Sequence, residues 1–186
     1  MLLDHDHSEL DEILARFFSE LEAGAIPESL AALDRFWAHL AVHIRAEQIH
    51  LFPTLLLALE QTGLAPKGSL LPDREEAQAL IAQLRDDHDF FMSRLAIAVK
   101  RLREIARGGA PEDRFALVSL APVVAVREMV AAVQQRIATH NELEESQVYR
   151  WIDALPTPRE RAALIEKMQW ELENLPPRFR QPERGK

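Results

Sequence analysis

Two short segments of the chain place a histidine and a glutamate one helical turn apart. They are His43–Glu47, with the sequence HIRAE, and His140–Glu144, with the sequence HNELE. On an α-helix, side chains four positions apart lie on the same face, so each pair directs an imidazole nitrogen and a carboxylate oxygen at one point. Two such pairs facing each other across a helical bundle predict a site for two metal ions.

A further histidine precedes each pair, so the chain reads as His and then His-x3-Glu, twice over. His7 shares a helical face with Leu10 and Leu14, and His88 shares one with Phe91. A single His-x3-Glu pair is most often a solvated surface pair. Two pairs with a histidine on an apolar face before each fit that interpretation poorly, because burying these groups without partners costs several kcal/mol. A metal ion removes that cost by using the nitrogen lone pairs and the carboxylate charges.

The composition narrows the range of folds and ligands. The chain has 186 residues, of which 47% are hydrophobic, and it contains six glycines and one tyrosine. This predicts one well-buried, mainly helical domain. The formal net charge is −8 and the basic residues are scattered, which argues against nucleic acid as a partner. The chain has no cysteine, so a metal site must use nitrogen and oxygen ligands.

The sequence also favours a cytoplasmic protein. The N-terminal residues lack the basic stretch and apolar run of a signal peptide. No apolar run approaches the roughly 20 residues that a membrane-spanning helix needs. We therefore expect no membrane as a partner.

Apolar residues at helical spacing predict four long helices. They span about residues 4–23, 28–61, 73–107 and 112–155. Pro53 is expected to kink or break the second helix, and an interruption is expected near Pro122 in the fourth. Residues 63–72, with two prolines and two glycines, are expected to form a loop. The fold class is therefore all-α, an up-down antiparallel four-helix bundle. Because His7 comes early in its helix, the site is expected to be displaced towards one end.

A fifth helix follows the bundle. Thr157–Glu160 has the capping-box pattern with a proline at the first helical position, which predicts a helix to about Leu175 and then a mobile basic tail. We therefore divide the chain into a bundle, residues 1–156, and a C-terminal helix with its tail, residues 157–186. This second part is expected to pack on the bundle or to form a dimer contact.

Four segments of the chain resemble the hemerythrin-like HHE cation-binding domain family over about residues 4–155. They are Asp6–Asp11, His43–Pro53, Asp87–Phe91 and His140–Tyr149. The resemblance implies a hemerythrin-like four-helix bundle with a non-heme di-iron centre whose carboxylates bridge the metals. Transferred residue by residue, it implies the ligands His7, His43, Glu47, His88, His140 and Glu144.

The chain departs from the oxygen-carrying members at one position. They have a second histidine one turn before the third-helix ligand, where this chain has Leu84. One iron is therefore expected to lack a ligand. His39 or His50, each one turn from the first His-x3-Glu pair, are candidates for the missing nitrogen; otherwise they are polar neighbours. His5 is expected to be a solvated terminal histidine.

Imidazole and carboxylate ligands suit iron, with manganese or zinc as alternatives. The leading hypothesis is a protein with two iron ions, bridged by oxo or hydroxo, that binds oxygen, nitric oxide or iron for sensing, storage or protection. One alternative is a di-iron enzyme that reduces peroxide or nitric oxide. It needs a proton donor, and Tyr149, five residues beyond Glu144, is not clearly on the metal face. A metal-free helical interaction protein is the other alternative, and a homodimer is compatible with any of the three.

Overall fold

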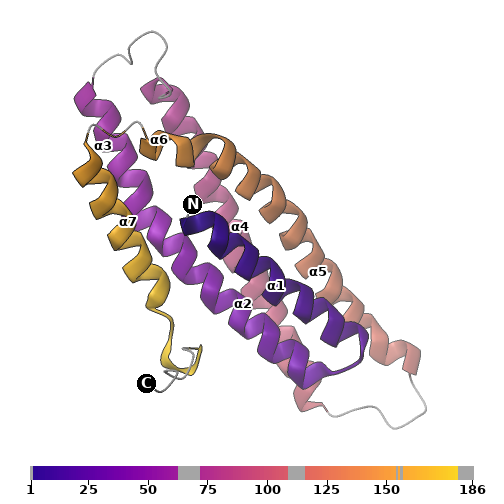
Figure 1. The fold of residues 1–186 in the computed structure, drawn as a ribbon. Coiled ribbons are helices and arrows are strands. Elements are labelled where there is room, and N and C mark those ends of the chain that lie inside the picture. The colour runs from indigo at the N-terminus through magenta and orange to yellow at the C-terminus, as the bar shows by residue number, and fades with distance from the viewer. Residues whose placement is uncertain (1, 63–71, 109–115, 154, 156, 180–186) are drawn as a thin grey trace, which may run out of the picture.

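Helices make up almost all of the computed structural model, which describes residues 2–62, 72–108, 116–153, 155 and 157–179. No strand occurs among these residues. The four long arms of the bundle run alternately up and down (Figure 1), and they are built on α1 (Leu2–Glu22), α2 (Ile26–Ala46), α4 (Arg74–Arg107) and α5 (Ala116–Leu143). The prediction of an all-α, up-down bundle with an additional C-terminal helix is confirmed.

The helix ends follow from local sequence. α1 and α2 are joined by a tight turn in which Gly24 has a φ of 74°, a conformation that glycine adopts without steric cost. The Asp73 side chain accepts a hydrogen bond from the Glu76 backbone N–H at the start of α4. Thr157 and Glu160 form the predicted capping box at the start of α7 (Pro158–Glu173).

Two of the arms contain a short π-helix at the same relative place. The π-helix η1 (Glu47–Leu51) joins α2 to α3 (Phe52–Thr62), and η2 (Glu144–Val148) joins α5 to α6 (Tyr149–Asp153). Each π-helix therefore begins at the glutamate of a His-x3-Glu pair. The interruption expected near Pro122 is wrong, because α5 runs through Pro122 without a break. Pro122 is exposed, so its ring does not disturb the core.

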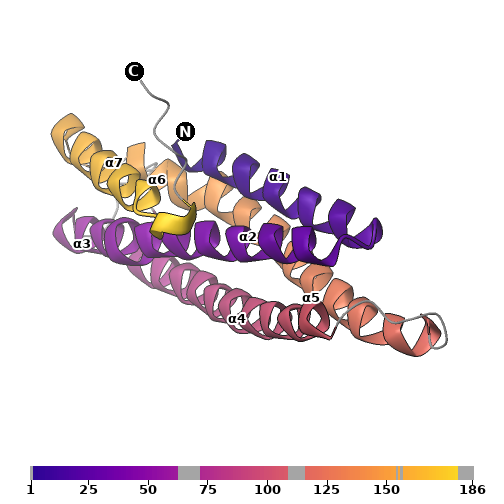
Figure 2. The same cartoon turned by 90° about the horizontal axis from the view of Figure 1, so that it is seen from below.

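The core consists of two clusters along the bundle axis. One cluster, which includes Leu10 and Phe17 of α1, lies in the half of the bundle that α1 covers. The other contains Leu3 and, from α7, Leu164 and Met168. Figures 1 and 2 show that α1 begins about midway along the other three arms. Beyond the start of α1, α7 lies alongside α2 and α3. The C-terminal helix thus packs where α1 does not reach.

This arrangement places the start of α1 at the middle of the molecule. Because Leu3 packs in one cluster and Leu10 in the other, His7 lies between them. The site is therefore central, and the expected displacement towards one end is wrong. The sequence pattern indicated that His7 is early in its helix, but not that α1 spans only part of the bundle.

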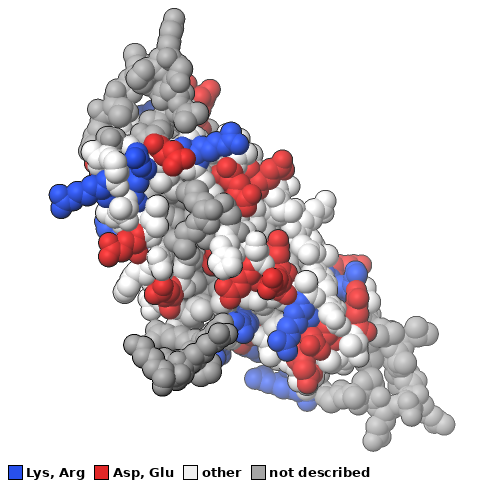
Figure 3. All heavy atoms as spheres, in the orientation of Figure 1, with Lys and Arg blue, Asp and Glu red and all other residues white. Residues whose placement is uncertain are grey.

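Two other expectations concern the ends of the described segments and the surface. The described residues include only the last residue of the loop predicted at 63–72. They also leave out the tail beyond residue 179. Within the described part, no helix is long and apolar enough to cross a membrane. On the face in Figure 3, acidic and basic side chains are interspersed among the described residues, which is not the clustered cationic surface that binds a phosphate backbone.

Candidate metal centre

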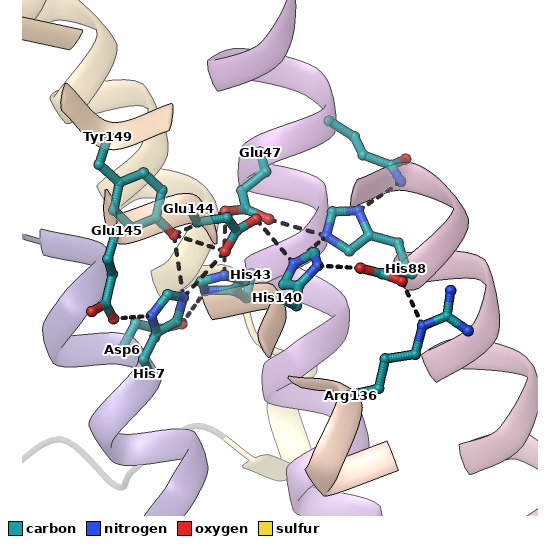
Figure 4. Close-up of polar contacts among 12 residues, drawn as sticks. Asp6, His7, His43, Glu47, His88, Arg136, His140, Glu144, Glu145 and Tyr149 are labelled. Atoms are coloured by element: carbon teal, nitrogen blue, oxygen red, sulfur yellow. Dashed lines mark hydrogen bonds and ion pairs between the residues drawn. The ribbon is translucent and has the colours of Figure 1, made fainter. Parts of the chain in front are cut away.

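The six residues proposed as ligands from the sequence meet in the middle of the bundle (Figure 4). They come from all four arms, and each is at most 4% exposed. Their potential ligand atoms form two sets, in each of which the atoms lie within 4.8 Å of one another. We call Glu47, His88, His140 and Glu144 the His88 group, and His7, His43 and Glu144 the His7 group.

The atoms of the His88 group have the spacing of neighbours in one coordination shell. His88 Nε2 lies 3.2 Å from both His140 Nε2 and Glu47 Oε2. His140 Nε2 lies 3.0 Å from Glu144 Oε1. With metal bonds of about 2.0–2.2 Å, adjacent ligand atoms are about 3–3.5 Å apart, so these distances would suit the ligands of one ion.

The same two carboxylates reach the His7 group with their other oxygens. Glu144 Oε2 lies 3.5 Å from His7 Nε2, and Glu47 Oε1 lies 3.4 Å from His43 Nε2. Each glutamate therefore directs one oxygen towards each group. This arrangement would let each carboxylate connect two ions, one in each group.

Each of the four histidines uses Nδ1 for a partner on a neighbouring helix and keeps Nε2 for the centre. The Nδ1 contacts are His7 to Glu145 Oε1 at 2.8 Å, His43 to Asp6 Oδ2 at 2.6 Å, His88 to the Gln48 amide at 3.2 Å, and His140 to Asp87 Oδ2 at 3.2 Å. A partner on Nδ1 fixes the ring and its tautomer, which is how metal-binding histidines are held in proteins. The four contacts connect α1 to η2, α2 to α1, α4 to η1 and α5 to α4, which closes a ring around the bundle.

These partners were missed as functional residues, although the sequence carries a signal for them. Each one is the immediate neighbour of a candidate ligand on another helix, as in the pairs Asp6-His7, Glu47-Gln48, Asp87-His88 and Glu144-Glu145. An acid or amide adjoins five of the six candidate ligands, all except His43, and this pattern could have been noticed. Which histidine each one contacts depends on how the helices pack.

The partners of His88 and His140 carry less charge than the other two. Gln48 is neutral, and the amide orientation in which its oxygen accepts from Nδ1–H leaves His88 Nε2 with a lone pair. Asp87 also accepts a hydrogen bond from Arg136 Nε at 2.5 Å, so its charge is offset. The His7 group, by contrast, is backed by the carboxylates of Asp6 and Glu145.

Tyr149 lies at the centre, which corrects the expectation that it is not clearly on the metal face. In η2 the Tyr149 backbone N–H bonds to the Glu144 carbonyl, five residues back. A π-helix brings positions i and i+5 onto one face, so Tyr149 follows Glu144 into the site. Its hydroxyl lies 3.0 Å from Glu47 Oε1, 3.1 Å from Glu144 Oε2 and 3.2 Å from His7 Nε2.

Without a cation, the centre concentrates groups that are costly to bury. Burial raises the pKa of Glu47, but His43 and His88 lower it well below its ordinary value. Burial lowers the pKa of His43, but Glu47 and Asp6 raise it well above 6.5; Glu144 raises the pKa of His140 in the same way. Burial and then the two glutamates raise the pKa of Tyr149 well above 10.0.

The residues present fit a metal ion. Glu47 Oε2 and Glu144 Oε1 are buried, and their close neighbours among the described residues are His88 Nε2 at 3.2 Å and His140 Nε2 at 3.0 Å, neither contact having the geometry of a hydrogen bond. A buried carboxylate oxygen beside an imidazole lone pair is unfavourable unless a proton or a cation lies between them, and a cation among these oxygens and the four Nε2 lone pairs would remove that cost. Nitrogen and oxygen donors in this mixture suit iron, manganese and zinc.

The two histidines proposed to complete the shell lie elsewhere. His39 Nδ1 faces Glu9 at 3.9 Å, and His50 Nε2 faces Glu171 at 3.8 Å. Within the described chain, neither joins the two groups of ligand atoms. Leu84 is fully buried in a core cluster, so its position is filled by a hydrocarbon side chain. His5 is exposed, as expected.

An open groove leads to one side of the centre. It has a volume of about 780 Å³, lies between α1 and the arm of α5 and η2, and is lined by His7 and Glu145 among others. His7 therefore separates the groove from the buried carboxylates. A small ligand approaching from solvent along this groove meets the His7 group first.

Comparison with known proteins adds one match. The family model described as hemerythrin HHE cation binding domain matches residues 2–152. That range contains all six proposed ligands, the four Nδ1 partners and Tyr149. Neither the curated proteins nor the solved structures gave a match.

Proposed function

The chain belongs to the hemerythrin HHE cation-binding family, and from this premise we propose that it holds two iron ions and binds a small ligand at them. The physiological ligand would be oxygen or nitric oxide, with iron itself as the cargo in a storage role, and the purpose would be sensing, storage or protection. The observation that carries the proposal is the common orientation of His7, His43, His88 and His140: Nε2 inward, Nδ1 held by a partner.

In this proposal the protein residues hold and neutralise the ions. The ligands would be His7, His43, Glu47, His88, His140 and Glu144, and an oxo or hydroxo group would complete the bridge between the ions. Iron supplies reversible electron donation to a diatomic ligand when it is bound. The two carboxylates offset part of the metal charge, and the Nδ1 partners hold each imidazole in the tautomer that presents a lone pair.

The surroundings of the centre favour the binding of a small ligand at ions that stay buried over the release of those ions into solvent. Phe52 and Phe91 lie against His88, at ring-centroid distances of 6.0 and 6.5 Å, and keep water from that side. The groove beside His7 gives the other side a route to solvent. We infer an arrangement in which a small ligand enters along α1 while the ions stay buried. Manganese or zinc remains an alternative occupant, since both accept the same donors.

Metal analysis of the aerobically purified protein, with its absorption spectrum, tests the proposal. We expect about two irons per chain and the bands of an oxo-bridged ferric pair. His140→Ala should lower the metal content, because it removes a nitrogen from the His88 group. His5→Ala is the matched control, since His5 is exposed on α1, and it should retain the wild-type content. Protein that stays metal-free after iron-replete expression would contradict the proposal and favour a metal-free interaction bundle.

A di-iron catalyst that reduces peroxide or nitric oxide is the second candidate. Such a reaction needs a proton donor beside the ions, and the Tyr149 hydroxyl lies within hydrogen-bond distance of both bridging carboxylates. Stopped-flow mixing of the reduced protein separates the two functions. A reversible change on mixing with oxygen or nitric oxide indicates binding, whereas steady consumption of peroxide or nitric oxide with an added reductant indicates catalysis.

Two further expectations belong with this proposal. We propose a cytoplasmic location. The C-terminal helix leaves Trp170 64% exposed and Ile165 40% exposed, a feature compatible with a homodimer contact. Sedimentation at micromolar concentration would decide between monomer and dimer.

A further inference from the structure

The Tyr149 hydroxyl oxygen occupies a position that electrostatics makes difficult to explain without a cation. Its neighbours at 3.0–3.2 Å are Glu47 Oε1, Glu144 Oε2 and His7 Nε2. A phenol has one proton, so it can donate to one of these three atoms. His7 donates from Nδ1 to Glu145, which leaves Nε2 with a lone pair when the ring is neutral. Two of the three contacts therefore bring electron-rich atoms together with no proton between them.

The distances are those between ligands of one ion. Tyr149 Oη, His7 Nε2 and Glu144 Oε2 are separated by 3.1–3.5 Å, and Glu47 Oε1 lies 3.0 Å from the phenol oxygen. Ligand atoms about 2.0–2.2 Å from a metal ion have separations of this size. Relative to His7 Nε2 and Glu144 Oε2, the phenol oxygen thus lies where a third ligand atom of one ion would lie.

We propose that Tyr149 is a ligand of the ion in the His7 group, binding through its phenolate oxygen. The inference rests on the proposed metal-binding function and assigns this group an oxygen ligand that is absent from the His-x3-Glu pattern and from the six ligands implied by the family resemblance. On coordination the O–H bond is exchanged for an oxygen–metal bond, and the proton leaves to water. The phenolate adds one negative charge to the two carboxylates.

The position that corresponds to Tyr149 in the arm of the other His-x3-Glu pair, beside the His88 group, shows why only one ion would have this ligand. Phe52 follows Glu47 by five residues, as Tyr149 follows Glu144, and its backbone N–H bonds to the Glu47 carbonyl across η1 in the same way. Phe52 stacks on His88 with ring planes 11° apart. A benzyl side chain has no donor atom, so the two ions differ at this position.

The chain has a single tyrosine, which makes the test specific. Ferric iron bound to a phenolate gives a visible charge-transfer band and tyrosinate modes in resonance Raman spectra. In the iron-loaded, oxidised protein these signals can come only from Tyr149. We expect both in the wild type and neither in Tyr149→Phe, with metal content measured on the same samples. Phe52→Leu is the matched control, because it removes the aromatic ring of the other half and should keep the tyrosinate signals.

The outcomes separate this inference from the function on which it rests. Bound iron without a tyrosinate signal in the wild type overturns the ligand assignment and leaves the metal function intact; Tyr149 is then a hydrogen-bond or proton donor to the carboxylates. Protein that binds no iron overturns both. The wild-type spectrum decides the question even if Tyr149→Phe fails to fold.

Discussion

The His7 group and the His88 group share both carboxylates and differ in what surrounds them. The histidines of the His7 group are backed by two carboxylates, and His7 itself contacts a phenol and lines an open groove. The histidines of the His88 group are backed by an amide and by a carboxylate paired with Arg136, and they face phenylalanine rings. A repeated sequence pattern has thus produced two unequal halves. We infer that the His7 half exchanges ligands and stabilises positive charge, while the His88 half holds its ion in an apolar setting.

The two glutamates set the limit of this comparison, because each serves both halves. Glu47→Ala should lower the affinity for both ions by more than about a hundredfold, since even partners that only orient a ligand contribute about 10–100-fold. Metal analysis after dialysis against a weak chelator measures the loss. Retention of two ions with an unchanged spectrum would show that Glu47 does not connect the halves.

Histidine substitutions should separate the halves. His7→Ala is expected to remove the ion of the His7 group and leave one ion per chain, because the four residues of the His88 group remain. His88→Ala should remove the other ion and preserve the tyrosinate signal. Metal content and the visible spectrum of the two variants provide the comparison. Equal loss of both ions in both variants would mean that the halves do not bind independently.

Replacing an Nδ1 partner should weaken metal binding more when that partner is charged than when it is neutral. Asp6→Asn is expected to weaken binding at the His7 group by about 10–100-fold, because it replaces the carboxylate that fixes His43. Gln48→Leu should weaken the His88 group by less than about tenfold, since the amide is neutral and lies 3.2 Å away. Competition with a chromophoric chelator measures both. A larger effect for Gln48→Leu would reverse the proposed order of the halves.

The smallest expected effect is the difference between the pH values at which the His7 group and the His88 group lose their ions. A bound ion needs neutral imidazoles, so ions are lost as the pH falls through the histidine pKa values. The pKa of His43 is raised well above 6.5 and that of His140 is raised less far, so the His7 group should lose its ion at the higher pH. Metal content after equilibration across the pH range tests this order.

In the metal-free protein the pH dependence should have the opposite sign, because here a rise in pH, not a fall, removes a favourable contribution of His43. Since the pKa of folded His43 is raised, its contribution to stability is fully present below 6.5 and declines as the pH rises through the folded value. Thermal unfolding of chelated protein against pH measures this decline. His43→Gln should remove it. An unchanged pH profile in that variant would locate the titrating group elsewhere.

Much of the fold and half of the centre could be predicted from spacing. Histidines and glutamates at i, i+4 and leucines at helical spacing depend on the geometry of a single helix, which every helix shares. The pairs His43–Glu47 and His140–Glu144, and the apolar faces of His7 and His88, were therefore visible in the sequence. Pro122 misled the prediction because whether a proline breaks a helix depends on its tertiary surroundings, and α5 continues through this exposed one.

What only the tertiary structure decided are the contacts between helices. The ring of Nδ1 partners depends on which neighbour each helix meets, and the position of the site depends on where α1 begins along the bundle, with α7 packed beyond that point. Tyr149 shows the same limit within one helix: α-helical spacing turns it away from Glu144, and the π-helix returns it to the centre. The sequence by itself determined which donor atoms the protein has and which of them share a helical face, because the geometry of a single helix follows from its backbone alone. Their assembly into two unequal halves required packing, because distances between helices are fixed by side chains far apart in the chain.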